Sequence, residues 1–144
     1  GDSLVPIERF HIPGLILGAD IKPRVVKTVA SQIDLPTTLL SLMGISATHP
    51  MTGRDLTQEP SGQPGRAMMQ YNDHLAWMEG DRVVVLRPDK VPTHGRYEPK
   101  TKHLEVVAPP EDAAMLEKRA LAHSLLPAWL YREQRYRLPE AAKN

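Results

Sequence analysis

The first third of the chain pairs a short apolar run with a compact amphipathic segment. Residues 13–18, "PGLILG", are apolar throughout, and their short length favours a strand buried on both faces over a helix. Residues 24–34, "RVVKTVASQID", continue in extended, β-branched fashion. Asp34 then provides a helix cap ahead of "LPTTLLSLM", and Gly44 provides the left-handed residue that commonly ends a helix. The pattern predicts a strand followed by a short capped helix, as in layered α/β domains.

The second half of the chain has the pattern of an antiparallel sheet. Residues 46–65 are rich in proline, glycine and polar side chains without a period, which predicts a loop or linker. Gly80 favours a hairpin turn because glycine adopts positive φ without strain. The β-branched and alternating runs predict strands over 66–72, on both sides of the turn within 74–88, around Tyr97 and over 103–109.

Residues 109–137 close the pattern as a helical segment, "PPEDAAMLEKRALAHSLLPAWLYREQRYR". Glu111 and Asp112 stand in its expected first turn, where carboxylates favour the helix dipole. Pro127 lacks the N–H that continues a helix, so we expect the first helix to end near Leu126 and a second segment to follow.

The apolar positions of this helical segment predict a core for the second half of the chain. Leu116 and Ala120 share one helical face, and the Trp129-Leu130-Tyr131 cluster follows the proline. We expect all of them to pack on the hairpins beside Trp77 or residues 83–85, because two large aromatic side chains exposed together are unusual.

Composition and charge exclude several classes of function. The chain has 144 residues, 14 prolines and a net charge of +1, which indicates one folded, loop-rich domain or a piece of a larger one, without an electrostatic footprint for nucleic acid. Only the tail over 131–144 is locally basic. Its basic residues could meet an acidic partner or lipid headgroups, but a solvated helix end is the commoner explanation, so the sequence assigns the tail no function. Cysteine is absent, which excludes disulfides, thiolate metal sites and cysteine nucleophiles. No apolar stretch approaches the ~20 residues of a membrane span, so any export or anchoring signal would lie outside this sequence.

The residues that commonly carry chemistry form no recognisable site. We expect surface positions for the histidines, because no two stand at metal-ligand spacing; they are His11, His49, His74, His94, His103 and His123. Asp73-His74 is the one tempting metal-binding pair, but it lies between two strand-like runs and is expected to form a connecting turn. No G-x-S-x-G elbow or glycine-rich phosphate loop occurs, and "GDSLV" at residues 1–5 follows no strand-like segment.

Three stretches, "FHIPGLILG", "SQIDLPTTLLSLMGI" and "MTGRDL", resemble the C-terminal third of the sulfatase and lipoteichoic-acid-synthase-like enzymes of the alkaline phosphatase superfamily. The matching residues are His11, Pro13, Ile16, Ser31, Gln32, Asp34, Thr37, Thr38, Leu39, Leu40, Leu42, Gly44, Ile45, Gly53, Asp55 and Leu56. Pro36 stands one place earlier relative to Asp34 than in many relatives. "WMEGDRVVVLRP" and "KHLEVVAPPED" resemble the family's C-terminal hairpin more loosely.

The resemblance implies an α/β parent enzyme, of which this chain is an α+β fragment. Residues 1–57 would supply the terminal strand and helix of an alkaline-phosphatase-like sheet, residues 58–65 a linker, and residues 66–144 a small antiparallel sheet with a C-terminal helix. The helix after Asp34 would cover the main sheet, so its apolar face would be exposed where that sheet is missing.

The resemblance also places the catalytic chemistry outside this chain. Relatives carry a threonine, serine or formylglycine nucleophile and a D-H-G metal motif, all of which would precede Gly1. Asp73-His74 follows the helix instead of preceding it, and Leu75 replaces the glycine. We therefore assign no catalytic, cofactor-binding or metal-ligating residue here, and expect the full-length enzyme to use a divalent metal (Mn, Ca, Mg or Zn).

The resulting expectation is the C-terminal part of a metal-dependent sulfatase-family hydrolase or phosphoglycerol transferase, structural and site-flanking but inactive alone. His11 stands where formylglycine sulfatases usually have arginine, which favours the phosphoglycerol-transferase-like branch. Its partner would be the upstream catalytic portion, at the periplasmic or extracellular face of a bacterial inner membrane, with membrane contact only through segments not present here. The alternative is an autonomous α+β binding or interaction module.

Overall fold

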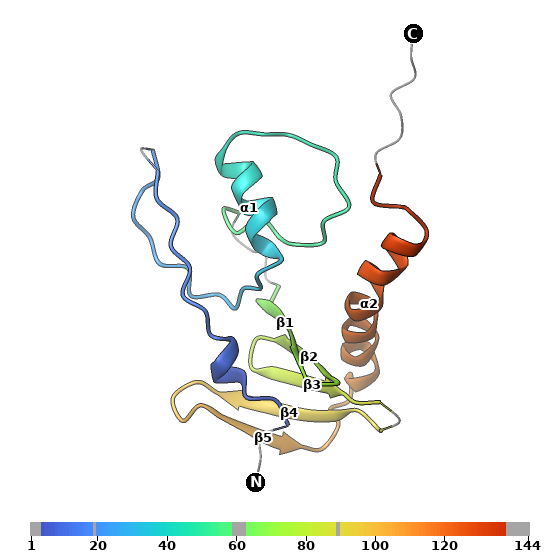
Figure 1. The fold of residues 1–144 in the computed structure, drawn as a ribbon. Coiled ribbons are helices and arrows are strands. Elements are labelled where there is room, and N and C mark those ends of the chain that lie inside the picture. Colours follow the sequence, from blue (N-terminus) through green and yellow to red (C-terminus); the bar gives the residue numbers. More distant parts are fainter. Residues whose placement is uncertain (1–3, 19, 59–62, 89, 138–144) are drawn as a thin grey trace.

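The structure is a computed structural model that describes residues 4–18, 20–58, 63–88 and 90–137. Its elements combine one short 3-10 turn, two helices and one five-stranded sheet (Figure 1). In chain order they are η1 (Ile7–Phe10), α1 (Asp34–Leu42), β1 (Arg66–Tyr71), β2 (His74–Glu79), β3 (Arg82–Leu86), β4 (Thr93–Glu98), β5 (His103–Val107) and α2 (Ala113–Arg132).

The sheet is an antiparallel meander in the order β1-β2-β3-β4-β5. Tight turns set its register: Asn72 at φ 54° joins β1 to β2, and Gly80 at φ 62° joins β2 to β3, where Glu79 pairs with Arg82. Lys102, with φ 56°, lies in the turn before β5. The strands predicted in the second half of the chain and the glycine turn are therefore confirmed.

Both faces of the sheet are covered, which explains why the three valines of β3 are buried. On one face, Val83 and Val85 lie in a cluster with Val5 and Ile7 from the start of the chain. On the other face, Val84 lies in a second cluster with residues of α2. The N-terminal residues thus reach across to the antiparallel sheet and complete one of its two layers.

Helix α2 packs on the sheet with its first half only. Leu116 and Ala120 are buried in the cluster with Trp77, as predicted. The expected packing of the aromatic cluster is wrong, since Trp129 and Tyr131 are 43% and 76% exposed. The reason is that α2 runs as one helix beyond the sheet, so its last turns have no apolar surface beneath them (Figure 1).

The expected break of α2 at Pro127 is also wrong, and the helix begins at Ala113, after the acidic pair. A proline inside a helix removes one backbone hydrogen bond without preventing the turns on either side from forming. Here the sheet holds the earlier turns. A C-terminal motif holds the later ones, since Arg135 N donates to Leu130 O at 2.9 Å and Gln134 N to Tyr131 O at 3.2 Å.

The predicted α+β class is confirmed, but the predicted strand over 13–18 does not form. Residues 11–18 and 20–33 make an excursion along one side of α1 without joining a ladder (Figure 1). An extended segment becomes a strand only when a neighbouring strand accepts its backbone hydrogen bonds, and in the described residues no such neighbour exists. No helix in the same ranges has the length and apolarity needed to cross a bilayer.

Candidate functional site: the platform around helix α1

Helix α1 buries its polar side and exposes its apolar side. Asp34, Thr37 and Thr38 are buried, whereas Leu35 and Leu39 are exposed. A helix at the surface of a globular domain normally does the opposite. We call α1 together with the segment over 46–57 the α1 platform, because this segment accounts for the reversal.

Asp34 connects α1 to that segment through a fully buried carboxylate. Its Oδ1 accepts a hydrogen bond from Arg54 N at 2.7 Å, its Oδ2 accepts one from Ser31 N at 2.9 Å, and the Arg54 guanidinium lies 3.2 Å from Oδ2. The predicted capping role is therefore wrong. Asp34 is the first helical residue, Ile33 precedes it without a side-chain cap, and the carboxylate is used to join distant segments.

The two buried threonines continue this connection along the helix. Thr38 Oγ1 donates to Asp34 O at 2.7 Å and accepts from Leu56 N at 3.0 Å. Thr37 Oγ1 lies 3.0 Å from Asp34 O and 2.8 Å from Arg54 O. The platform is held together by charge and hydrogen bonds in place of an apolar core.

Gly53 allows the close approach that these bonds require. A Cβ atom at this position would lie 1.8 Å from Ile33 O, so no other residue fits without moving the backbone. At the other end of the helix, Gly44 adopts φ 67° and the Ile45 N–H donates to Leu40 O at 2.9 Å. The predicted glycine end of the helix is confirmed.

A second polar cluster, the arginine junction (Arg54, Arg66 and His123), joins the platform to the sheet and α2. Arg54 Nη2 donates to Val29 O at 3.0 Å, and Arg66 Nη2 donates to Thr52 O at 2.7 Å. Arg66 Nη1 lies 3.1 Å from His123 Nε2. Three parts of the chain that are far apart in sequence therefore meet at two guanidinium groups.

The His123 ring in this junction is held in the neutral state. Burial lowers the pKa of His123, the Arg66 charge lowers it further, and Glu79 partly opposes both effects. Because the Arg66 group can only donate, His123 Nε2 must accept the bond between them. The ring also stacks on Trp77 with centroids 4.3 Å apart.

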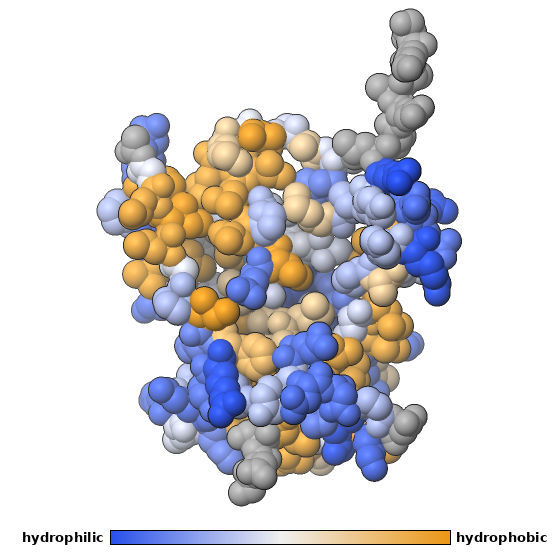
Figure 2. Space-filling model, in the orientation of Figure 1, coloured by the Kyte–Doolittle hydropathy of each residue, from blue (hydrophilic) through white to orange (hydrophobic). Residues whose placement is uncertain are grey.

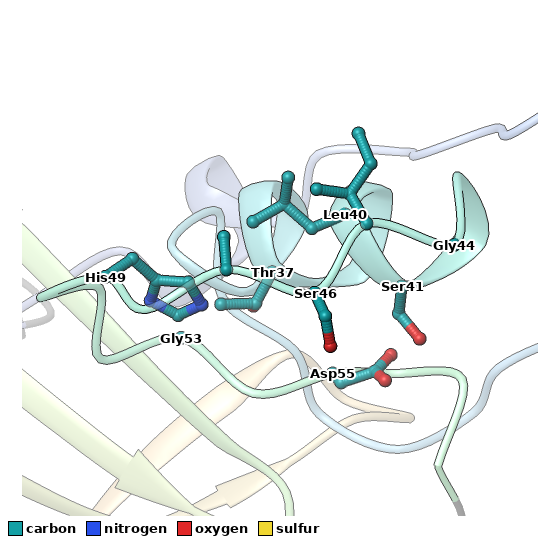
Figure 3. A pocket seen from close by; sticks show the side chains of 10 residues that line it. Thr37, Leu40, Ser41, Gly44, Ser46, His49, Gly53 and Asp55 are labelled. Atoms are coloured by element: carbon teal, nitrogen blue, oxygen red, sulfur yellow. The ribbon is translucent and has the colours of Figure 1, made fainter.

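An open pocket of about 520 Å³ lies between α1 and the segment that follows it (Figure 3). It is lined by Thr37, Leu40, Ser41, Gly44, Ile45, Ser46, Ala47, His49, Gly53 and Asp55. Burial raises the pKa of Asp55, but hydrogen bonds from Thr57 and Ser41 outweigh it and lower the pKa overall. Figure 3 shows the Ser46 side chain directed toward the Asp55 carboxylate and His49 at the opposite end.

The residues singled out in the sequence lie apart from this platform. Asp73 occupies the β1–β2 turn, as predicted, and His74 opens β2 with its Nδ1 3.1 Å from Leu4 O. The expectation that all histidines are on the surface is wrong for His94, which is buried with its Nε2 2.8 Å from Glu117 Oε1. Within the described ranges, no three His, Asp or Glu side chains converge on a common metal position.

Arg54 is the residue that sequence reasoning missed. It stands inside "MTGRDL", where the glycine, the aspartate and the leucine carry the family resemblance and the arginine does not. An arginine beside a glycine, 20 positions from a lone helix-initiating aspartate, is a weak local signal because ion pairs over such distances leave no period in the sequence.

No protein-family model matches the chain. A crystal structure of a protein in the alkaline phosphatase superfamily from Vibrio parahaemolyticus is similar, with a TM-score of 0.85 and 37% sequence identity. The match covers 96% of this chain and 33% of that one, so the chain spans about a third of the length of its neighbour. The chain therefore has the α+β fold of an alkaline-phosphatase-like fragment, as the sequence predicted. Its structural neighbour is a superfamily protein.

Proposed function

We propose that this chain is the C-terminal, non-catalytic part of a metal-dependent hydrolase or phosphoglycerol transferase that acts on sulfate or phosphate esters. The observation that carries the proposal is the match of almost the whole chain to one third of a superfamily protein. The sulfatase-like motifs around Asp34 and Gly53 support the finer assignment.

The α1 platform supports this role because it exposes apolar surface that a soluble domain normally covers. Figure 2 shows the apolar side chains gathered over α1 and the neighbouring N-terminal excursion. The exposed residues are Ile12, Leu15, Leu17, Val25, Val26, Leu35, Leu39, Leu42, Met43 and Ile45. We propose that the upstream catalytic portion of the same polypeptide covers them, and that residues 13–18 become a strand by pairing with its sheet.

The catalytic metal would be held by that upstream portion. The Asp73-His74 pair of this chain does not fit such a site, because His74 Nδ1 is within hydrogen-bonding distance of the Leu4 carbonyl and Asp73 lies in an exposed turn. When bound in the complete enzyme, a divalent ion of this kind would neutralise charge on the phosphoryl or sulfuryl group.

The same proposal includes the domain boundaries of this chain and the cellular location of the complete enzyme. Residues 1–57 would belong to the catalytic core and residues 66–144 to a C-terminal subdomain, joined by a linker at 58–65, of which 59–62 lie outside the described residues. The complete enzyme would act at the periplasmic or extracellular face of a bacterial inner membrane.

An autonomous binding module remains the second candidate. It is favoured by the two apolar clusters, on opposite faces of the sheet, which together involve residues from Val5 to Ala120. A chain with a core of this kind can fold without a partner.

Ester hydrolysis with matched surface variants tests the proposal. The chain alone should hydrolyse neither aryl phosphate nor aryl sulfate with Mn, Ca, Mg or Zn, whereas the complete polypeptide should hydrolyse at least one of them. Leu15→Asp in the complete polypeptide should reduce its activity or assembly. Val91→Asp should not, although both residues are 81% exposed in this chain.

Two outcomes would contradict the proposal. Turnover by the chain alone that disappears in His74→Ala would place a catalytic site within it. Equal behaviour of the Leu15→Asp and Val91→Asp variants in the complete polypeptide would show that the apolar surface docks nothing, and would favour the binding module.

A further inference from the structure

The second half of helix α2 carries an apolar stripe on its outer side. Leu121, Leu125 and Trp129 are spaced four residues apart, so they lie on one face of the helix, and all three are exposed. This face is opposite Leu116 and Ala120, which pack on the sheet. In Figure 1, α2 lies on the opposite flank of the molecule from the N-terminal excursion, so this stripe is separate from the surface assigned to the catalytic portion.

The stripe ends in a basic and aromatic turn. Arg132, Arg135 and Arg137 are all exposed, and Glu133 is the one acidic residue in 121–137, so this stretch has a formal charge of +2 with histidine neutral. Tyr131 stacks with Tyr136 at a centroid separation of 6.1 Å, and the Arg137 guanidinium lies over the Tyr136 ring. Three of the seven aromatic residues of the chain are therefore exposed beside three arginines.

We propose that the outer face of α2, from Leu121 to Arg137, is a binding surface for anionic lipid headgroups. Tryptophan and tyrosine favour the boundary between headgroups and acyl chains, where an apolar ring and a polar edge are both satisfied. The leucines of the stripe bury in the same boundary when the helix lies flat on the bilayer. Arginine forms paired hydrogen bonds with phosphate oxygens.

Charge complementarity selects an anionic membrane over a second copy of this chain. A symmetric dimer through this face would bring two surfaces of charge +2 together, which is unfavourable. An anionic bilayer instead attracts each arginine near its surface. The proposal does not depend on the function proposed above, and it places membrane contact within this chain.

Vesicle binding by the intact protein provides the test. The protein should sediment with vesicles of phosphatidylglycerol and phosphatidylcholine, should bind pure phosphatidylcholine much more weakly, and should be released by salt. Each arginine contributes about fivefold to binding at an anionic surface, so the triple variant Arg132→Gln, Arg135→Gln, Arg137→Gln should bind about 100-fold more weakly.

A matched variant removes three charges from loops of the sheet. Lys90, Lys100 and Lys102 are exposed in loops next to β4 and β5, and replacing all three with glutamine should leave vesicle binding within about twofold of the parent. Tryptophan emission should shift to shorter wavelength on vesicle binding. This shift should be absent in Trp129→Phe, because Trp77 is already buried.

Three results would overturn the proposal. The first is equal binding to anionic and zwitterionic vesicles, and the second is an equal loss in the arginine and lysine variants. The third is a dimer in solution that Leu125→Asp dissociates, because it would assign the surface to a second copy.

Discussion

The antiparallel sheet and the α1 platform bury their side chains in opposite ways. In the sheet, Val83 and Val84 are fully buried on opposite faces, and apolar contacts cover both sides. In the platform, the fully buried residue is the carboxylate Asp34, while Leu39 on the same helix is exposed. The sheet buries its apolar surface within the chain. The α1 platform pairs its polar groups within the chain and leaves its apolar surface exposed.

The two regions therefore serve different purposes: the sheet stabilises the chain, and the platform presents a surface for docking. The sheet gains stability from the removal of apolar area from water, which requires no further partner. The platform is positioned by the Asp34–Arg54 pair and by the threonine hydrogen bonds, which are directional and fix the orientation of α1. A helix held through its polar side can present its apolar side in a defined orientation, as docking requires.

The largest expected effect is at Asp34. Asp34→Ala would leave the partly buried Arg54 and Ser31 backbone N–H groups without their acceptor and would remove the carboxylate that faces the Arg54 guanidinium, which costs about 3 kcal/mol. A helix cap alone would be worth only about 1 kcal/mol. Denaturant unfolding measures the difference. A loss near the lower figure would show that the platform does not depend on this ion pair.

The same substitution made in both regions should have a comparable effect in the sheet and a smaller one in the platform. Leu116→Ala should destabilise the chain by ~2–5 kcal/mol, because Leu116 is buried between α2 and the sheet. Leu39→Ala should cost the isolated chain clearly less than Leu116→Ala, since Leu39 is 37% exposed and Leu116 only 1%. Thermal or denaturant melts compare the two variants. Similar losses at both positions would mean that α1 also buries its leucines in solution.

The sheet could be predicted from the sequence because its signals are local. Alternating and β-branched runs marked the strands, and Gly80 marked a turn that its positive φ confirms. The glycine end of α1 at Gly44 was predictable for the same reason. Each of these features depends on residues within a few positions of one another.

The platform could be predicted only in part because its determinants are distant. Asp34 was recognised as important, but its role depends on Arg54, 20 positions away. The apolar residues 13–18 favour a strand, but a strand also needs a neighbouring strand for its backbone hydrogen bonds, and the described residues offer none to this segment. Helix α2 continues through Pro127 because the residues before the proline pack on the sheet and those after it form a helix-ending motif. The sequence around the proline does not reveal either of these interactions.

The arginine junction, which joins the two regions, should make stability depend on pH. Burial and Arg66 lower the pKa of His123 below its ordinary value of 6.5, with Glu79, itself paired with Arg119, opposing the shift. As the pH falls through 6.5, His123 takes up a proton more readily in the unfolded chain than in the folded chain. The free energy of unfolding therefore decreases as the pH is lowered from 6.5 toward the pKa of His123 in the folded chain.

Two histidine variants isolate this contribution. His123→Gln keeps an acceptor for Arg66 without a titrating ring, so it should weaken the dependence of the denaturant midpoint on pH below 6.5. His49→Gln replaces an exposed histidine and should leave that dependence unchanged. If both variants retain the full dependence, the junction is not its source.

The smallest expected change in unfolding free energy is at Trp129, in the part of α2 that extends beyond the sheet. Trp77 is buried in the sheet, whereas Trp129 lies about two and a half helical turns beyond Ala120 and is partly exposed. Trp129→Ala should therefore change the unfolding free energy by no more than ~0.5 kcal/mol, as expected for a surface position. It should also remove the component of tryptophan emission that a water-soluble quencher reaches, leaving the shielded emission of Trp77. A destabilisation of several kcal/mol would show instead that the outer half of α2 packs against the chain, and that the apolar region extends beyond the sheet.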